Sequence, residues 1–164
     1  MLFQVHAFVH DNAAVAVKVS RDGGWSYATC AIHTLQLAVG RALGAQRAVV
    51  DALAVACKLV GHFRHSAKAT AVLEKLQRER NPEEQPLKVV QDVPTRWNSS
   101  FYMIQRLLLL RPYIREYART SSAALTQPSS NQWDLLDALV SILTHAEEIT
   151  KDMSRADACI SQVS

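Results

Sequence analysis

The chain has 164 residues, of which 49% are apolar and 20% charged, with a formal net charge of +3. This is the balance of an ordinary globular domain, and its mild positive charge is compatible with a nucleic-acid partner without establishing one. No run approaches the ~18 uncharged apolar residues that span a membrane, and no signal peptide precedes the first apolar residues. The three cysteines are an odd, widely spaced set, so we expect reduced thiols and no disulfide framework.

The N-terminal part predicts a strand, a helix and a second strand. Residues 5–10 form a short apolar run typical of a buried strand, and Asn12 is a suitable N-cap for a helix over 13–20. An Asp-Gly-Gly turn at 22–24 leads to a second strand within 25–31.

From residue 33 onwards the apolar spacing predicts helices only. We expect three in succession: one that ends at Gly44, one over 46–63, and one capped by Ser66 that ends in the charged run 74–80. The composition of 81–86 predicts a loop, and an extended segment follows over 87–93.

A long helix is expected over 99–119, with Pro112 kinking it or splitting it in two. Residues 120–130 are rich in Ser, Thr and Gln and predict a connection. The last helix carries an apolar stripe from Trp133 to Met153 at steps of three and four residues.

The sequence Asp-Val-Pro-Thr-Arg-Trp-Asn-Ser-Ser at 92–100 is the most informative stretch. Asn98, Ser99 and Ser100 are all good N-cap residues, so Arg96 and Trp97 are expected at the start of the long helix, where unpaired N–H groups attract anions. Such a pair suits nucleic acid, with Arg on a phosphate and Trp stacked on an unpaired base. The alternative is that Trp97 anchors the core and Arg96 is its solvated neighbour.

Other chemistry receives little support. Asp11 follows a strand, where it either contributes to a divalent-metal site or caps the next helix, and no partner carboxylates are evident. Cys30 and His33 have the spacing of half a zinc site, but the only candidates for the other half, His62 and His65, are separated from them by two helices, so we expect no zinc in the fold. Hydrolase, kinase and dehydrogenase signatures are absent from the sequence.

Taken in order, these stretches resemble the hAT (hobo/Activator) transposases and the BED-type zinc-finger proteins derived from them. No single motif is decisive, but five in the same order are specific. The stretches that carry the resemblance are 9–14, 30–39, 62–66, 95–99, and 125–126 ahead of 132–133.

The resemblance implies a mainly α chain, with two short strands of a truncated ribonuclease-H-like core over 1–32 and the first part of a helical insertion domain over 33–164. It also implies roles for individual residues. Asp11 looks like the second of three metal-binding catalytic acids, Cys30 and His33 look structural, and Arg96 with Trp97 looks like the pair that stabilises flipped DNA at the transposon end.

The family's first catalytic Asp and its catalytic Glu have no counterpart in the sequence, so Asp11 alone is not sufficient for catalysis. We therefore expect a non-catalytic piece of a nuclear, transposase-derived DNA-binding protein that uses no cofactor itself, whereas the parent family would use Mg²⁺ or Mn²⁺. DNA is a possible partner and a protein partner or self-association is expected, with no membrane and no small-molecule substrate. The alternative is a helical protein–protein interaction module that binds no nucleic acid, in which the 133–153 stripe is the docking surface.

Overall fold

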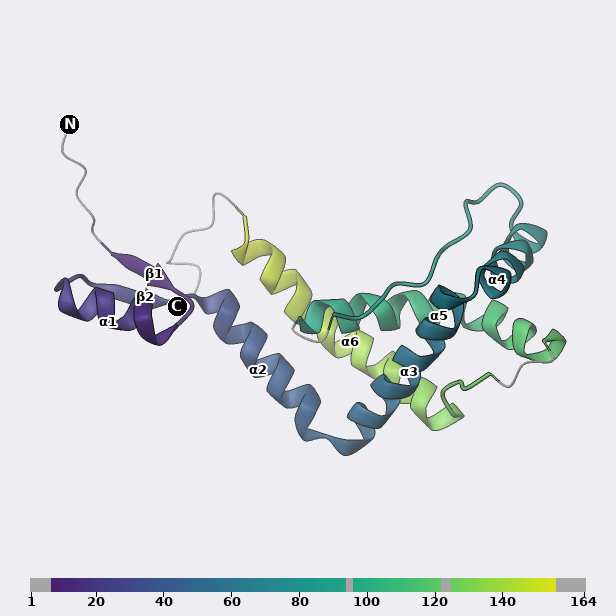
Figure 1. Cartoon of the computed structure of the whole chain (residues 1–164), viewed down its shortest axis with the longest axis horizontal. Helices are drawn as coiled ribbons and strands as arrows, with labels where there is room; N and C mark the ends of the chain where they lie inside the picture. Colours follow the sequence, from purple (N-terminus) through teal and green to yellow (C-terminus); the bar gives the residue numbers. More distant parts are fainter. Residues whose placement is uncertain (1–6, 94–95, 122–124, 156–164) are drawn as a thin grey trace. The chain divides into compact units, whose positions relative to one another are not determined.

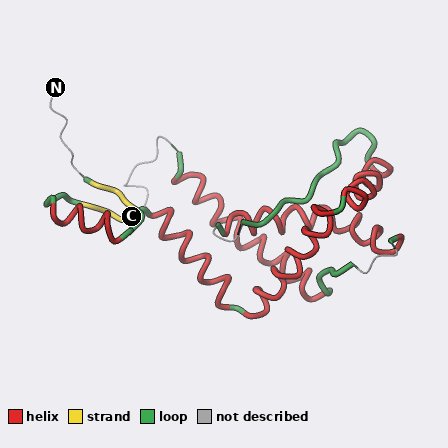
Figure 2. Tube along the Cα trace, viewed as in Figure 1, coloured by secondary structure: helices red, strands yellow, loops and turns green. Residues whose placement is uncertain are grey.

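A computed structural model describes residues 7–93, 96–121 and 125–155, which contain two short strands and six helices (Figure 1). The predicted class, mainly α with two short strands, is confirmed (Figure 2). The elements in chain order are β1 (Phe8–His10), α1 (Ala14–Asp22), β2 (Tyr27–Thr29), α2 (Ala31–Ala45), α3 (Arg47–His65), α4 (Ala67–Arg80), α5 (Trp97–Thr120) and α6 (Ser130–Met153).

The chain divides into two compact units. The first combines the residues up to Arg41 with those from Glu148 onwards, and the second is Ala42–Glu147. This division rests on which residues pack together. The predicted boundary at 32/33 concerns which parent domain each part derives from, and it stays a prediction.

The first unit contains the strand–helix–strand order expected from the sequence. β1 and β2 are parallel, with Phe8 opposite Tyr27 and His10 opposite Thr29, and α1 connects them. Asn12 does not cap α1 as predicted, because its φ of +69° places it in a left-handed turn that Asn tolerates. Ala13 occupies the N-cap position instead.

The second unit has one apolar core to which α3, α4, α5 and α6 all contribute. α5 supplies the largest share, because its apolar residues recur every three or four positions and so line one face. Six of them are almost completely buried: Met103, Ile104, Leu107, Leu110, Ile114 and Phe101.

Two helices of this unit begin with side-chain caps. The hydroxyl of Ser66 accepts a hydrogen bond from the amide of Ala69 at 3.1 Å, which confirms the predicted cap of α4. At the start of α6 the Ser129 hydroxyl accepts from the Gln132 amide at 3.3 Å, while the Gln132 side chain accepts from the Ser129 amide at 3.0 Å. This reciprocal pair is a capping box.

The predicted limits of α5 need correction. The helix begins at Trp97 with Arg96 as its N-cap, so none of Asn98, Ser99 and Ser100 caps it. It also continues without interruption through Pro112. Pro112 is exposed, so the carbonyl that loses its hydrogen-bond donor can be satisfied by water.

The apolar stripe of α6 is largely covered by the chain itself. Trp133, Leu136 and Leu143 are 2%, 0% and 4% exposed. The alternative function took this stripe as a docking surface, and in this structure its first half is core. Ile149, in the second half of the stripe, is 50% exposed, and Ile142, which lies outside the stripe, is 68% exposed.

Truncation of the central helix tests this description of the core. Leu107→Ala should lower the free energy of unfolding by roughly 2–5 kcal/mol, because it opens a cavity at a site with 0% exposure. Leu109→Ala is the matched control: it lies on the same helix but is 58% exposed, so it should change stability by less than about 0.5 kcal/mol. Urea unfolding followed by helical circular dichroism measures both, and equal losses would contradict the core described above.

Candidate nucleic-acid interface

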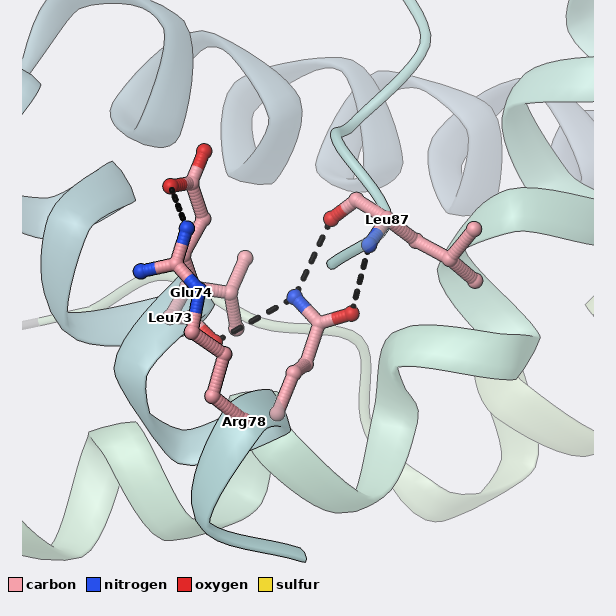
Figure 3. Close-up of polar contacts among 5 residues, drawn as sticks. Leu73, Glu74, Arg78 and Leu87 are labelled. Carbon is pink, nitrogen blue, oxygen red and sulfur yellow. Dashed lines mark hydrogen bonds and ion pairs between the residues drawn. The ribbon is translucent and has the colours of Figure 1, made fainter. Parts of the chain in front are cut away.

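An extended segment, residues 87–93, leads into the Arg–Trp stretch and is fixed at its start by one buried side chain. Gln77 of α4 is 6% exposed. Its amide oxygen accepts from the Leu87 amide at 2.8 Å, and its amide nitrogen donates to the Leu87 carbonyl at 3.0 Å and to the Leu73 carbonyl at 3.2 Å (Figure 3). The side chain thus pairs with the backbone as a neighbouring strand would, which satisfies both of its polar ends in the core.

Two arginines hold the next part of this segment. Arg106 of α5 donates to the Lys88 carbonyl at 2.7 Å, and Arg64 of α3 donates to the Gln91 side chain at 3.4 Å. The segment therefore has contacts with α3, α4 and α5 before it reaches Asp92, and these contacts fix the approach to the Arg–Trp stretch.

Asp92 ties the end of the segment to the first turn of α5. Its carboxylate accepts from the hydroxyls of Ser99 at 2.7 Å and Ser100 at 2.9 Å. The Ser99 hydroxyl also accepts from the Val93 amide at 2.7 Å. The two serines therefore hold the preceding chain against the helix, which explains why they do not act as N-caps. Burial and the nearby Asp92 carboxylate raise the pKa of the Cys57 thiol on α3, which lies 3.9 Å from that carboxylate.

Trp97 is the first residue of α5 and points into the protein. It is 4% exposed, and its ring centroid lies 6.5 Å from that of Phe101. A base has no access to an indole in this position, so the structure favours the alternative in which Trp97 is a core anchor.

Asn98 and Tyr102 are held by a buried acid on α6. Glu147 is 5% exposed, and its carboxylate accepts hydrogen bonds from the side-chain amide of Asn98 (Nδ2) and from the Tyr102 hydroxyl. The hydrogen bond to the Glu147 carboxylate, followed by partial burial, raises the pKa of Tyr102 to about 12. This cluster secures the start of α5 to α6.

Arg96 differs from its neighbours because its side chain is exposed. Among the described residues no hydrogen bond or ion pair of this side chain is found. The N-cap residue Arg96 makes no side-chain cap hydrogen bond, whereas α4 and α6 begin with serine caps. An exposed guanidinium thus stands at a helix N-terminus, where the helix dipole attracts anions, although the Ser99 amide already donates to the Arg96 carbonyl at 3.0 Å.

Two arginines of α5 make contacts within the protein. Arg106 contacts the Lys88 carbonyl, and the Arg111 guanidinium lies 5.1 Å from the centre of the Trp133 ring. The Lys88 side chain, in contrast, is exposed, and no partner is found for it among the described residues. Lys88 is therefore an available cation on the extended segment that leads to Arg96.

The residues at Asp11 do not fit a divalent metal. Asp11 is exposed, and its carboxylate accepts from the Ala13 amide at 3.1 Å. The contact forms a turn ahead of α1, whose N-cap residue is Ala13, so Asp11 is not the helix cap that the sequence left as the alternative. Within the described residues there is no group of three His, Cys, Asp or Glu side chains that could hold a metal ion.

Cys30 and His33 lie where β2 passes into α2. The Cys30 amide donates to the His10 carbonyl at 2.7 Å, and its carbonyl accepts from the Thr34 amide at 3.0 Å. The backbone of Cys30 therefore joins the sheet to the helix, while His33 lies half-buried in the first turn. Their structural role stays a prediction. His62 of the proposed other half-site instead lies 2.9 Å from the Tyr117 hydroxyl.

The sequence did not reveal Asp92 or Glu147 as parts of this site. For Asp92 a signal exists, since an acid seven residues before two serines can bridge a turn onto a helix start. For Glu147 none exists, because its partner Asn98 is 49 positions away and a glutamate on a helix is normally solvated.

The chain resembles known proteins along nearly its whole length. Residues 28–142 match the family model described as the ZBED1 RNase-like helical domain. The chain is 32% identical over 160 residues to the human Zinc finger BED domain-containing protein 4, which is 98% of this chain and 13% of that protein. It is 32% identical to human and 31% identical to mouse Zinc finger BED domain-containing protein 6, over 94% of this chain and 15% of each relative.

The chain thus spans roughly a seventh of the length of these curated relatives. No solved structure is significantly similar to it. None of the helices in the described part of the chain is both long and apolar enough to cross a membrane.

The Glu147 cluster can be tested through Tyr102. Tyr102→Phe should destabilise the protein by about 1.5–3 kcal/mol at neutral pH, because it removes a hydrogen bond to a buried carboxylate. Tyr113→Phe is the control on the same helix, since no hydrogen bond of its hydroxyl is found among the described residues, and it should be close to neutral.

The stability that Tyr102 contributes should depend on pH in one direction. The raised pKa favours the protonated phenol in the folded state, so this stability is complete below pH ~10 and is lost as the pH rises towards 12. Unfolding measured between pH 9 and roughly 12 should show a steeper decline in wild type than in Tyr102→Phe. Parallel declines would show that Tyr102 is not bonded to Glu147.

Proposed function

Because the chain belongs to the ZBED1 RNase-like helical domain family, we propose that it contacts DNA in the nucleus as part of a BED-type zinc-finger protein. The family confirms the predicted relationship with the BED-type proteins derived from hAT transposases. The DNA contact, the nuclear location and the absence of catalysis are the proposal.

The observation that carries the proposal is the position of Arg96. In the stretch 92–100, the side chains of Asp92, Trp97, Asn98, Ser99 and Ser100 are all buried or bonded within the protein. Arg96 is charged and exposed at the uncapped start of α5. An exposed arginine beside residues that are fixed in the fold is suited to binding a phosphate of a DNA backbone.

Trp97 has a different role here from the one that the sequence suggested. The sequence offered Arg96 and Trp97 as a pair that contacts DNA together. We now propose that Trp97 acts from inside the protein, by packing against Phe101 and fixing the first turn of α5. Arg96, with Lys88 as a second cation, then supplies the contact with the nucleic acid.

We further propose that the chain itself does not cleave DNA. In-line displacement on a phosphodiester by two metal ions requires several converging carboxylates. Asp11 is the single residue that resembles a member of the family's acidic triad, and its carboxylate is engaged with the Ala13 amide.

The alternative function, a protein–protein interaction module, is favoured by a different observation from the one the sequence offered. Ile142 and Ile149 are exposed on α6 and stand seven residues apart, a spacing that repeats on one side of a helix. A partner helix with an apolar stripe would suit them. This interface would be nearly insensitive to salt, whereas a phosphate contact weakens steeply as salt rises.

Arg96→Ala tests the leading proposal. It should weaken DNA binding roughly tenfold at low salt, through loss of one charge-assisted contact. It should also lower the slope of log K against log salt by about 1, with an unchanged melting temperature. Electrophoretic mobility shifts with single- and double-stranded DNA across a salt series give both quantities.

Arg115→Ala is the matched control, because Arg115 is also exposed on α5 but lies far from its start. It should leave both quantities close to wild type. Equal effects of the two variants would show that DNA responds to net charge alone and would remove Arg96 from the site.

Trp97→Ala tests whether Trp97 packs in the core or stacks on a DNA base. The variant should lose about 3–5 kcal/mol of stability, because a buried indole is removed from the core. A variant that keeps its melting temperature yet loses DNA affinity would instead show that a base stacks on Trp97.

A nicking assay tests whether the chain cleaves DNA. The chain should not nick supercoiled plasmid DNA in the presence of Mg²⁺ or Mn²⁺, and Asp11→Asn should behave in the same way as wild type. Metal-dependent nicking by wild type that Asp11→Asn abolishes would contradict the proposed absence of catalysis.

A further inference from the structure

A cavity lies near the C-terminal end of α5, far from Arg96. Its volume is about 330 Å³, and α3, α4 and the end of α5 line it. Trp97 and Tyr117 are twenty residues apart on one continuous helix, which corresponds to ~30 Å at 1.5 Å per residue. The lining residues are His62, Ser66, Lys68, Ala69, Val72, Tyr117, Thr120 and Ser121.

Hydrogen-bond donors dominate the polar part of this lining. Lys68 supplies an ammonium group, is exposed, and has no ion pair among the described residues. The Ser66 hydroxyl accepts from the Ala69 amide, so its own proton remains free to donate. The His62 Nε2 atom and the Tyr117 hydroxyl lie 2.9 Å apart, and this pair can also offer a proton to a ligand. None of the described residues that line the cavity carries a carboxylate.

The helix ends around the cavity add to this preference for an anion. α4 begins here, and its first N–H groups carry a partial positive charge. The C-terminal ends of α3 and α5 also lie here and would oppose an anion, but their carbonyls are partly occupied. The Phe63 carbonyl accepts from the Thr70 hydroxyl at 2.6 Å, and the Tyr117 carbonyl accepts from the Ser121 amide at 2.8 Å.

We propose that this cavity is a binding site for a phosphate group. Lys68 supplies the charge, while the Ser66 hydroxyl and the His62–Tyr117 pair orient the phosphate oxygens. The site is independent of the DNA contact at Arg96, because the two share no residue and lie at opposite ends of α5.

Titration of the full chain with inorganic phosphate, at constant ionic strength in chloride, tests the site by calorimetry. Wild type should bind phosphate, and Lys68→Gln should bind it roughly tenfold more weakly, because one charge-assisted hydrogen bond is lost. Lys75→Gln is the matched control: it makes the same change of charge on the same helix but pairs with Glu79 at 3.6 Å and does not line the cavity. It should bind phosphate as wild type does.

Absence of phosphate binding by wild type, or an equal loss in the two lysine variants, would overturn the proposal. Arg96→Ala should bind inorganic phosphate as wild type does, which would show that this site is separate from the proposed DNA contact. Loss of phosphate binding in Arg96→Ala would overturn the proposal. A second arm compares short oligonucleotides with and without a 5′-phosphate. Tighter binding of the phosphorylated strand that depends on Lys68 identifies a nucleic-acid end as the source, and equal binding of the two strands identifies free phosphate.

Discussion

The burial of Glu147 is the constraint on which the arrangement of α5 and α6 depends. A carboxylate that is 5% exposed is costly to remove from water unless donors replace the water molecules. Asn98 and Tyr102 supply such donors, and both lie in the first two turns of α5. α6 therefore packs favourably against the face of α5 that carries Asn98 and Tyr102, and the acid fixes how the first turns of α5 face α6.

The same logic explains how one residue of the stretch 92–100 becomes available for binding. Asp92 holds two hydroxyls of the first turn, and Glu147 holds Asn98, so these side chains are committed to the fold. Trp97 fills the space beneath them. Among the described residues of this stretch, Arg96 is the charged side chain that remains exposed, and the contacts of its neighbours fix the backbone from which it extends. Arg96 is thus available to a ligand because the neighbouring side chains are bonded or buried within the fold.

The sequence predicted the helices well, because their apolar faces follow the 3.6-residue repeat and because caps such as Ser66 depend on nearby residues only. It failed at the start of α5, where Ser99 and Ser100 look like caps but are bonded to Asp92. It left the position of Trp97 open, because burial of an indole depends on the helices that pack over it. The burial of Glu147 could not be predicted from the sequence. No nearby residue indicates that Asn98, 49 positions away, will replace water as its hydrogen-bond donor. Local chemistry therefore predicts elements, and long-range polar contacts decide which side chains face outwards.

The pairing of Gln77 with Leu87 has a consequence for how this chain can evolve. The two hydrogen bonds between them close the loop over 81–86 independently of the loop's own residues. The entropic cost of closing a loop grows only slowly with its length, by about 0.6 kcal/mol for each doubling. Residues can therefore be inserted into or deleted from this loop without displacing the extended segment that follows. Related proteins are free to vary in length here while they keep the register that leads to Arg96.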